Sequence, residues 1–185
     1  MASAFTHAFV GAAVSTLAPR PFRGVGLGVV LAAVAAAPDL DVVGFRFGVA
    51  YADPLGHRGL THSLPFALIV GLALAWPLAR WRGVPLASRA GVGLIAVIAL
   101  ACASHGVLDA FTDGGLGVGF LIPFDARRFF APWRPLLTSP LRAADFFDGV
   151  GLEILRNEMT WVWLPVGLCT AALFARRRRT EVNDG

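Results

Sequence analysis

Long apolar runs separated by short polar stretches dominate the chain. Five of these runs are expected to be helical, at residues 2–18, 25–37, 64–79, 90–110 and 160–175. A helix needs roughly 20 residues to cross the hydrocarbon core of a bilayer, with a range of about 17 to 25. The fourth run meets that length, the first, third and fifth are marginal, and the second is short because Pro38 follows it. The pattern predicts an all-α fold, a polytopic membrane helical bundle of about four to five transmembrane or membrane-embedded helices.

The composition agrees with a membrane location. Hydrophobic residues make up 56% of the 185 residues and charged residues only 15%, whereas soluble globular domains carry about 25% charged residues. The length suits one compact bundle. We therefore expect a single membrane-embedded domain over residues 1–176 and a short basic, disordered tail over residues 177–185.

The arginines predict how the chain is oriented in the membrane. They lie between the first and second runs, between the third and fourth, and after the fifth, and the positive-inside rule places these three sets in the cytoplasm. The C-terminus is then cytoplasmic, and the N-terminus and the loops at 38–63 and 111–159 lie on the outer side. The last loop also carries arginines, interleaved with acids, which weighs against this orientation. Its many aromatic, proline and glycine residues predict an interfacial segment.

Histidines and aspartates gather at the expected outer ends of the helices. The members of this group are His7, Asp39, Asp41, His57, His62, His105 and Asp109. His105 and Asp109 are four residues apart and so share one face of a helix, while Asp39 and Asp41 follow Pro38 and are expected on an extended turn. Ionisable groups in a membrane each cost roughly 2.5–3.5 kcal/mol on insertion scales. Their convergence therefore indicates a metal or catalytic site.

The histidine and aspartate side chains of this group indicate that the cofactor is a divalent metal. Histidine and aspartate without cysteine favour zinc, with manganese or iron as alternatives. Single residues also have simpler explanations: His7 could be a packing residue, and Asp39 and Asp41 could end or cap helices. Arg58 could hold a phosphate group of the substrate, or could only form a salt bridge to Asp39, Asp41 or Asp109.

Taken together, the motifs resemble those of a known family. An early histidine, "PDLD", "HRGLTHS" and "SHGVLDAFTDGG" followed by "PF" are similar to the YdjM-like family of bacterial inner-membrane proteins, described as membrane-bound metal-dependent hydrolases with LexA-linked regulation in some members. The likeness extends from His7 to about Phe124. It implies a multi-pass protein of the bacterial inner (plasma) membrane whose hydrolase site is built from the seven histidines and aspartates. The acids Asp125, Asp145, Glu153 and Glu158 remain unassigned.

These observations lead to a functional hypothesis. We expect a metal-dependent hydrolase in which a metal-activated water attacks an ester, with a phosphoester of a lipid or amphipathic molecule as the candidate substrate. Asp41 or Asp109 would accept the proton and Arg58 would hold the anionic group. The alternatives are a metal-binding transporter or sensor, and a structural protein whose helices are stapled by metal. The lipid bilayer is the expected partner, nucleic acid is not, and the oligomeric state stays open.

Overall fold

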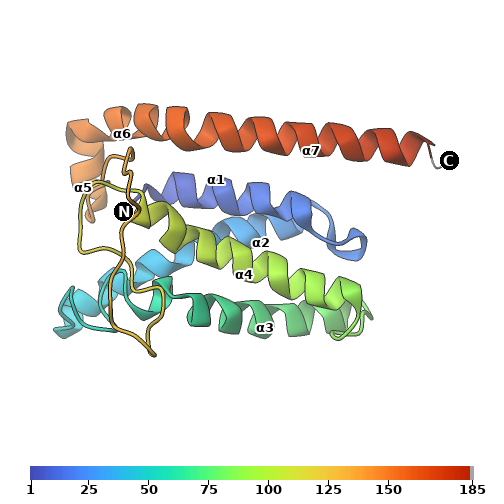
Figure 1. The fold of residues 1–185 in the computed structure, drawn as a ribbon, viewed down its shortest axis with the longest axis horizontal. Helices are drawn as coiled ribbons and strands as arrows, with labels where there is room; N and C mark the ends of the chain where they lie inside the picture. The colour runs from blue at the N-terminus through green and yellow to red at the C-terminus, as the bar shows by residue number, and fades with distance from the viewer. Residues whose placement is uncertain (184–185) are drawn as a thin grey trace.

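The computed structural model describes residues 1–183, with side chains as far as Arg177, and its regular structure is helical throughout (Figure 1). Within that part, four helical segments are long and apolar enough to cross a membrane, namely Val25–Phe47, Leu64–Trp81, Arg89–Ala110 and Ala143–Arg177, and Ala4–Leu17 is a shorter apolar one. The helices are α1 (Ala4–Val14), α2 (Val25–Ala36), α3 (Leu64–Trp81), α4 (Arg89–Ala110), α5 (Ala143–Asp145), α6 (Gly151–Glu158) and α7 (Leu164–Asn183). The predicted all-α membrane bundle is confirmed.

The second apolar run is longer than predicted. It does not end at Pro38, because α2 continues directly into a 3-10 helix, η3 (Ala37–Phe47). Pro38 lies in the first turn of η3, where proline's fixed φ is compatible with helical backbone. The nearby Ala35 carbonyl accepts from His105 Nδ1. The extended turn expected for Asp39 and Asp41 was therefore wrong, and both side chains project from helical backbone.

The last helical run also begins earlier than predicted. Helical structure starts at Ala143 and passes through two π-helical turns, η5 (Phe146–Val150) and η6 (Met159–Trp163). Gly149, with a φ of 132°, lets the chain bend inside the first of these turns. This segment carries many charged residues, so it does not stand out as an apolar run in the sequence and its helix was not predicted. The expected tail from residue 177 is helical as far as Asn183, and residues 184–185 lie outside the described part.

Helix α4 occupies the centre of the bundle, between α1, α2 and α3 (Figure 1). Its neighbour α3 turns a stripe of small residues, one every fourth position, toward the interior; these are Ala67, Gly71, Ala75 and Ala79. Small side chains let helix backbones approach closely, which is how helices gain contact in a membrane. The last turns of α4 are thereby held in the middle of one end of the bundle.

Close backbone packing between α1 and α2 gives a testable prediction. A Cβ at Gly11 would lie 2.3 Å from the Leu31 carbonyl oxygen, so Gly11→Ala is expected to lower the free energy of unfolding by about 1–3 kcal/mol. Gly26→Ala is the matched control, because nothing lies within 4 Å of its Cβ position and alanine favours a helix by about 1 kcal/mol. The thermal unfolding temperature in detergent should fall for Gly11→Ala and rise for Gly26→Ala. Equal shifts would contradict this packing.

Two loop regions, residues 48–63 and residues 111–142, cover the end of the bundle where the N-terminus lies (Figure 1). They are joined by the backbone, since Gly119 N–H donates to the Arg58 carbonyl and Leu64 N–H donates to the Phe120 carbonyl. The Arg128 guanidinium also donates across them, to backbone carbonyls of Tyr51, Ala52, Asp53 and His57. The polar residues at the helix ends are consequently enclosed.

Candidate metal centre

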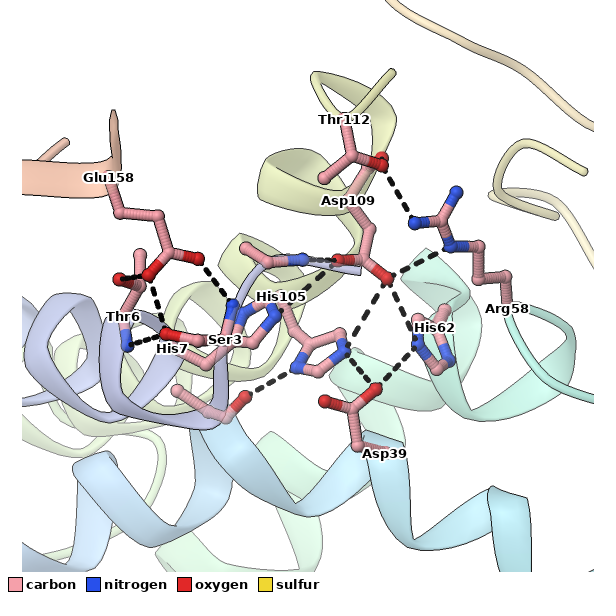
Figure 2. A network of polar contacts seen from close by, with 12 residues as sticks. Ser3, Thr6, His7, Asp39, Arg58, His62, His105, Asp109, Thr112 and Glu158 are labelled. Atoms are coloured by element: carbon pink, nitrogen blue, oxygen red, sulfur yellow. Dashed lines mark hydrogen bonds and ion pairs between the residues drawn. The ribbon is translucent and has the colours of Figure 1, made fainter. Parts of the chain in front are cut away.

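The seven histidines and aspartates singled out from the sequence meet in one buried cluster beneath these loops. Figure 2 labels His7, Asp39, His62, His105 and Asp109 of this cluster. They come from α1, η3, the loop before α3, the short 3-10 helix η4 (Leu60–His62) and the end of α4. The Asp39 side chain is the most exposed of the seven, at 11%, and that of Asp41 is 2% exposed. The members are His7, Asp39, Asp41, His57, His62, His105 and Asp109. Helix ends distant in sequence are thus brought together as expected.

His105 presents a lone pair to the centre of the cluster. Its Nδ1 lies 2.7 Å from the Ala35 carbonyl oxygen, and because a carbonyl can only accept, Nδ1 carries the hydrogen. In the neutral imidazole, Nε2 is then unprotonated. That atom lies 3.2 Å from Asp39 Oδ1 and 3.9 Å from Asp109 Oδ2. A backbone carbonyl thereby fixes the ring as it does in metal-binding histidines.

His62 is held in the same tautomer by different neighbours. Thr61 Oγ1 donates its proton to Asp41 Oδ2 at 2.8 Å, so it can only accept from His62 Nδ1 at 3.0 Å. His62 Nε2 is left with a lone pair, 3.7 Å from both Asp39 Oδ1 and Asp109 Oδ2. Two imidazole nitrogens from separate elements therefore face the same pair of carboxylates.

These four side chains form a set that fits one cation. One ligand atom from each of Asp39, His62, His105 and Asp109 lies within 4.8 Å of the other three. The inward-facing atoms are buried and make no hydrogen bond within the described structure. Burying facing lone pairs without a proton or cation between them is costly. Two nitrogens and two carboxylate oxygens suit zinc, manganese or iron.

A second set adjoins the first and shares His62. His57 Nδ1 lies 2.8 Å from Asp41 Oδ1, and His62 Nδ1 lies 3.2 Å from Asp41 Oδ2. The Asp41 carboxylate orients the His57 ring, and His57 Nε2 is buried without a hydrogen-bond partner in the described structure. An aspartate that fixes a histidine and leaves its far nitrogen open forms a pair suited to accepting a proton.

The electrostatics of the cluster favour positive charge. Burial lowers the pKa of His62, but the carboxylates of Asp39 and Asp41 outweigh burial and raise it to about 9. The lone pair of His62 Nε2 therefore attracts a proton whenever no cation is present. The carboxylates of Asp39, Asp41 and Asp109 lie together in this cluster, and Arg58 Nε pairs with Asp109. A divalent cation would balance negative charge among them.

Arg58 forms the salt bridge that the sequence left as one alternative. Its Nε lies 3.2 Å from Asp109 Oδ2, and its other donors bond Thr112 Oγ1 and the Gly114 carbonyl, each at 2.7 Å. The residue is fully buried and has a φ of 63°, a backbone conformation that costs about 1–3 kcal/mol for a non-glycine residue. Such strain is kept where the surrounding contacts demand a particular side-chain position.

His7 lies beside the two sets without belonging to either. Its ring stacks on His105, with centroids 3.6 Å apart, and its Nε2 lies 3.4 Å from Asp109 Oδ1. Neither ring nitrogen has a hydrogen-bond partner within the described structure. The face of the His7 ring therefore contacts His105, and its edge approaches Asp109. The role of His7 as a metal ligand stays a prediction.

Glu158 is a buried acid whose role the sequence did not reveal. It accepts hydrogen bonds from Ser3 N–H, Ser3 Oγ and Thr6 Oγ1 (Figure 2). Trp163 Nε1 donates to the same threonine. These bonds tie the start of α1, one turn before His7, to α6. The available signal was an acid placed directly before an apolar run, where charge is expensive.

Removing the charge of Glu158 should loosen this junction. We expect Glu158→Gln to lower the free energy of unfolding by about 1.5–3 kcal/mol, the range for a hydrogen bond to a charged group. Glu153→Gln is the matched control, because Glu153 is exposed on the same helix, and its effect should stay within about 0.5 kcal/mol. Scanning fluorimetry in detergent measures both. Equal stabilities of the Glu158→Gln and Glu153→Gln variants would show that Glu158 does not anchor α1.

Comparisons with known proteins agree with the architecture. The family model described as YdjM inner membrane protein matches residues 1–181. A curated relative, inner membrane protein YbcI of Escherichia coli (strain K12), is 40% identical over 159 residues, which cover 85% of this chain and 87% of that protein. No solved structure matches the chain.

Proposed function

The chain belongs to the YdjM inner membrane protein family, and we propose that it is a membrane-bound metal-dependent hydrolase. In this proposal Asp39, His62, His105 and Asp109 hold a divalent metal, with zinc as the first candidate. The metal would activate water to attack an ester. The site is proposed to face the outer side of the membrane, as the arginine pattern predicts.

One observation carries the proposal. The Ala35 carbonyl holds the hydrogen of His105 on Nδ1, so a buried Nε2 lone pair faces the Asp39 carboxylate at 3.2 Å. A packing histidine would gain more from the opposite arrangement, with a hydrogen between nitrogen and carboxylate. His62 repeats the pattern. Two such lone pairs aimed at two carboxylates support a cation site.

The chemistry then divides between the metal and the protein. A divalent ion bound there would lower the pKa of a water ligand toward about 7 and polarise the ester. The Asp41–His57 pair lies beside His62, and we propose that His57 Nε2 takes the proton of the attacking water while Asp41 holds the ring. Both oxygens of Asp109 contact other groups, which suits it to a positioning and ligating role more than to proton transfer.

Arg58 has a supporting part in this proposal. Its guanidinium holds the Asp109 carboxylate in place, because charge-assisted pairs of this kind fix both partners. The role of an anion clamp, predicted from the sequence, requires some of its bonds to Thr112 and Gly114 to be exchanged for substrate oxygens. A phosphoester of a lipid or amphipathic molecule remains the proposed substrate class, since the site lies at the end of a membrane bundle.

Hydrolysis by the metal-loaded protein tests this function. We expect the zinc-supplemented, detergent-purified chain to cleave members of a panel of aryl phosphoesters and carboxyl esters, to lose this activity with a chelator and to regain it with zinc. His57→Ala should keep the metal and lose roughly 100-fold or more in rate, the scale of acid–base catalysis. A protein that binds metal but cleaves nothing in the panel, at any metal loading, would favour metal-stapled structure or transport instead.

A further inference from the structure

The two terminal nitrogens of the Arg128 guanidinium are surrounded by backbone carbonyl groups. Nη1 donates to the His57 carbonyl at 3.0 Å and to the Gly117 carbonyl at 3.5 Å. Nη2 lies 3.1–3.3 Å from the carbonyl oxygens of residues 51–53. Because these terminal N–H groups are directed at oxygens of the protein itself, Arg128 is unsuited to binding the anionic group of a substrate.

The loop at residues 48–63 turns tightly beside this guanidinium. A Cβ at Gly59 would lie 2.3 Å from the Pro54 carbonyl oxygen, so the turn leaves no room for a side chain there. Among the backbone contacts of the described residues, the carbonyls of Tyr51 and His57 accept from no N–H group. Backbone groups shielded from water nearly always have a hydrogen-bond partner, and the guanidinium is the partner of both carbonyls.

The His57 imidazole is fixed by neighbours on two sides. Its Nδ1 lies 2.8 Å from Asp41 Oδ1, and the Tyr51 ring packs edge-on against it, with centroids 5.1 Å apart and an interplanar angle of 88°. Arg128 bonds the backbone of both Tyr51 and His57. The guanidinium therefore holds the base of the imidazole and the aromatic ring that packs against it.

We propose that Arg128 is a positioning residue for His57. The inference rests on the proposed function, in which His57 Nε2 takes the proton of the attacking water. The described hydrogen bonds of Arg128 all go to loop carbonyls, so Arg128 acts through the backbone and contacts neither water nor substrate. It keeps the His57 ring directed at the cluster.

The shape of the guanidinium is essential to this role. Its planar fork carries five N–H donors, whereas the lysine ammonium is a compact charge with three. The carbonyls around Arg128 come from two loops and lie about both terminal nitrogens. Arg128→Lys is therefore expected to keep the charge and lose part of the network. Full replacement of Arg128 by lysine would overturn the proposal.

Chemical modification of His57 tests the proposal without relying on hydrolysis. The zinc-supplemented, detergent-purified full chain is treated with diethyl pyrocarbonate, and modified histidines are located by mass spectrometry. His57 is fully buried and should react slowly in the wild type. In Arg128→Ala it should react about tenfold faster or more, because losing a hydrogen bond to a charged group shifts local opening by at least that factor.

His105 is the internal control, because the Ala35 carbonyl holds its ring on a separate element and its reactivity should not change. Arg134→Ala is the matched control variant, since Arg134 is exposed on the same loop and its guanidinium lies over the Phe130 ring at 4.7 Å. This variant should react as the wild type does. An equal increase at His57 and His105 would indicate general loosening and would overturn the proposal.

Added guanidinium chloride, far below denaturing concentrations, should slow the modification of His57 in Arg128→Ala toward the wild-type rate. The free ion can restore the planar fork between the carbonyls, whereas methylammonium chloride at the same concentration should have little effect. Arg128→Lys, which keeps the charge, provides the comparison if Arg128→Ala does not fold, and its rate should be intermediate. Wild-type reactivity of His57 in a folded Arg128→Ala variant would overturn the proposal.

Hydrolysis kinetics give the second measurement. With an aryl phosphoester that the wild type cleaves, Arg128→Ala should lower kcat by roughly 100-fold, the scale of a small misplacement of a reacting group, with unchanged metal content and similar KM. Unchanged kcat would overturn the proposal. A wild type that binds zinc and cleaves nothing would refute the hydrolase function alone, and the modification rates would still decide whether Arg128 holds His57.

Discussion

Replacing His105 with alanine is expected to abolish stoichiometric metal binding. The variant removes one of four side chains whose ligand atoms lie within 4.8 Å of one another, and it leaves Asp39 and Asp109 facing His62 alone. Loss of a residue that only orients a ligand already lowers metal affinity by about 10–100-fold. Loss of the ligand itself should exceed that range, and metal-dependent hydrolysis should fall with it.

Elemental mass spectrometry on zinc-supplemented protein measures this result. Ser104→Ala is the matched control, because Ser104 neighbours His105 on α4 but bonds only the Ala101 carbonyl among the contacts described. His62→Ala, on a separate element, should lose the metal as His105→Ala does. Thermal unfolding of the metal-free proteins checks that both variants fold. Full metal content in a folded His105→Ala variant would contradict the ligand set.

Arg58→Met is expected to cost about 3–5 kcal/mol of unfolding free energy, the price of leaving a buried charge without its partner. The Asp109 carboxylate is fully buried and 3.2 Å from Arg58 Nε. Methionine is also an apolar side chain, so Thr112 Oγ1 and the Gly114 carbonyl would lose their donors. A bound divalent cation should restore part of this stability, because it would compensate the same carboxylate.

The same substitution at Arg127 provides the control. Arg127 pairs with Asp125 at the surface, where its side chain is 75% exposed, and exposed ion pairs contribute little to stability because water screens them. Chemical unfolding of both variants, with and without zinc, gives the comparison. Equal losses at the two positions would show that Arg58 and Asp109 do not form a buried pair.

The centre of the site could be predicted from two features that can be read from short stretches of sequence. They are the spacing of residues on a helix and the free-energy cost of placing charge in a membrane. His105 and Asp109 are four residues apart and do point toward one another in the cluster, with Nε2 and Oδ2 3.9 Å apart. Placing each ionisable group at one end of its apolar run also brought separate helices together correctly. The cost of burying charge in a membrane made that convergence meaningful before any contact was known.

Other features depend on contacts between distant parts of the chain. Glu158 bonds Ser3 and Thr6, more than 150 residues away, and a single acid in a sequence does not name its partners. The helical course of "PDLD" was missed because Pro38 usually ends a helix, whereas here it begins a 3-10 helix that extends α2. The separation of His7 from both ligand sets likewise depends on how α1 packs on α4.

The proposed metal centre is tested by the metal content and metal coordination of the wild-type chain, measured together by elemental analysis and X-ray absorption at the zinc edge. We expect at least about one ion per chain after zinc supplementation, bound by imidazole nitrogen and carboxylate oxygen with no sulfur. A folded, zinc-supplemented protein without stoichiometric metal, or a coordination shell that contains no imidazole, would contradict it.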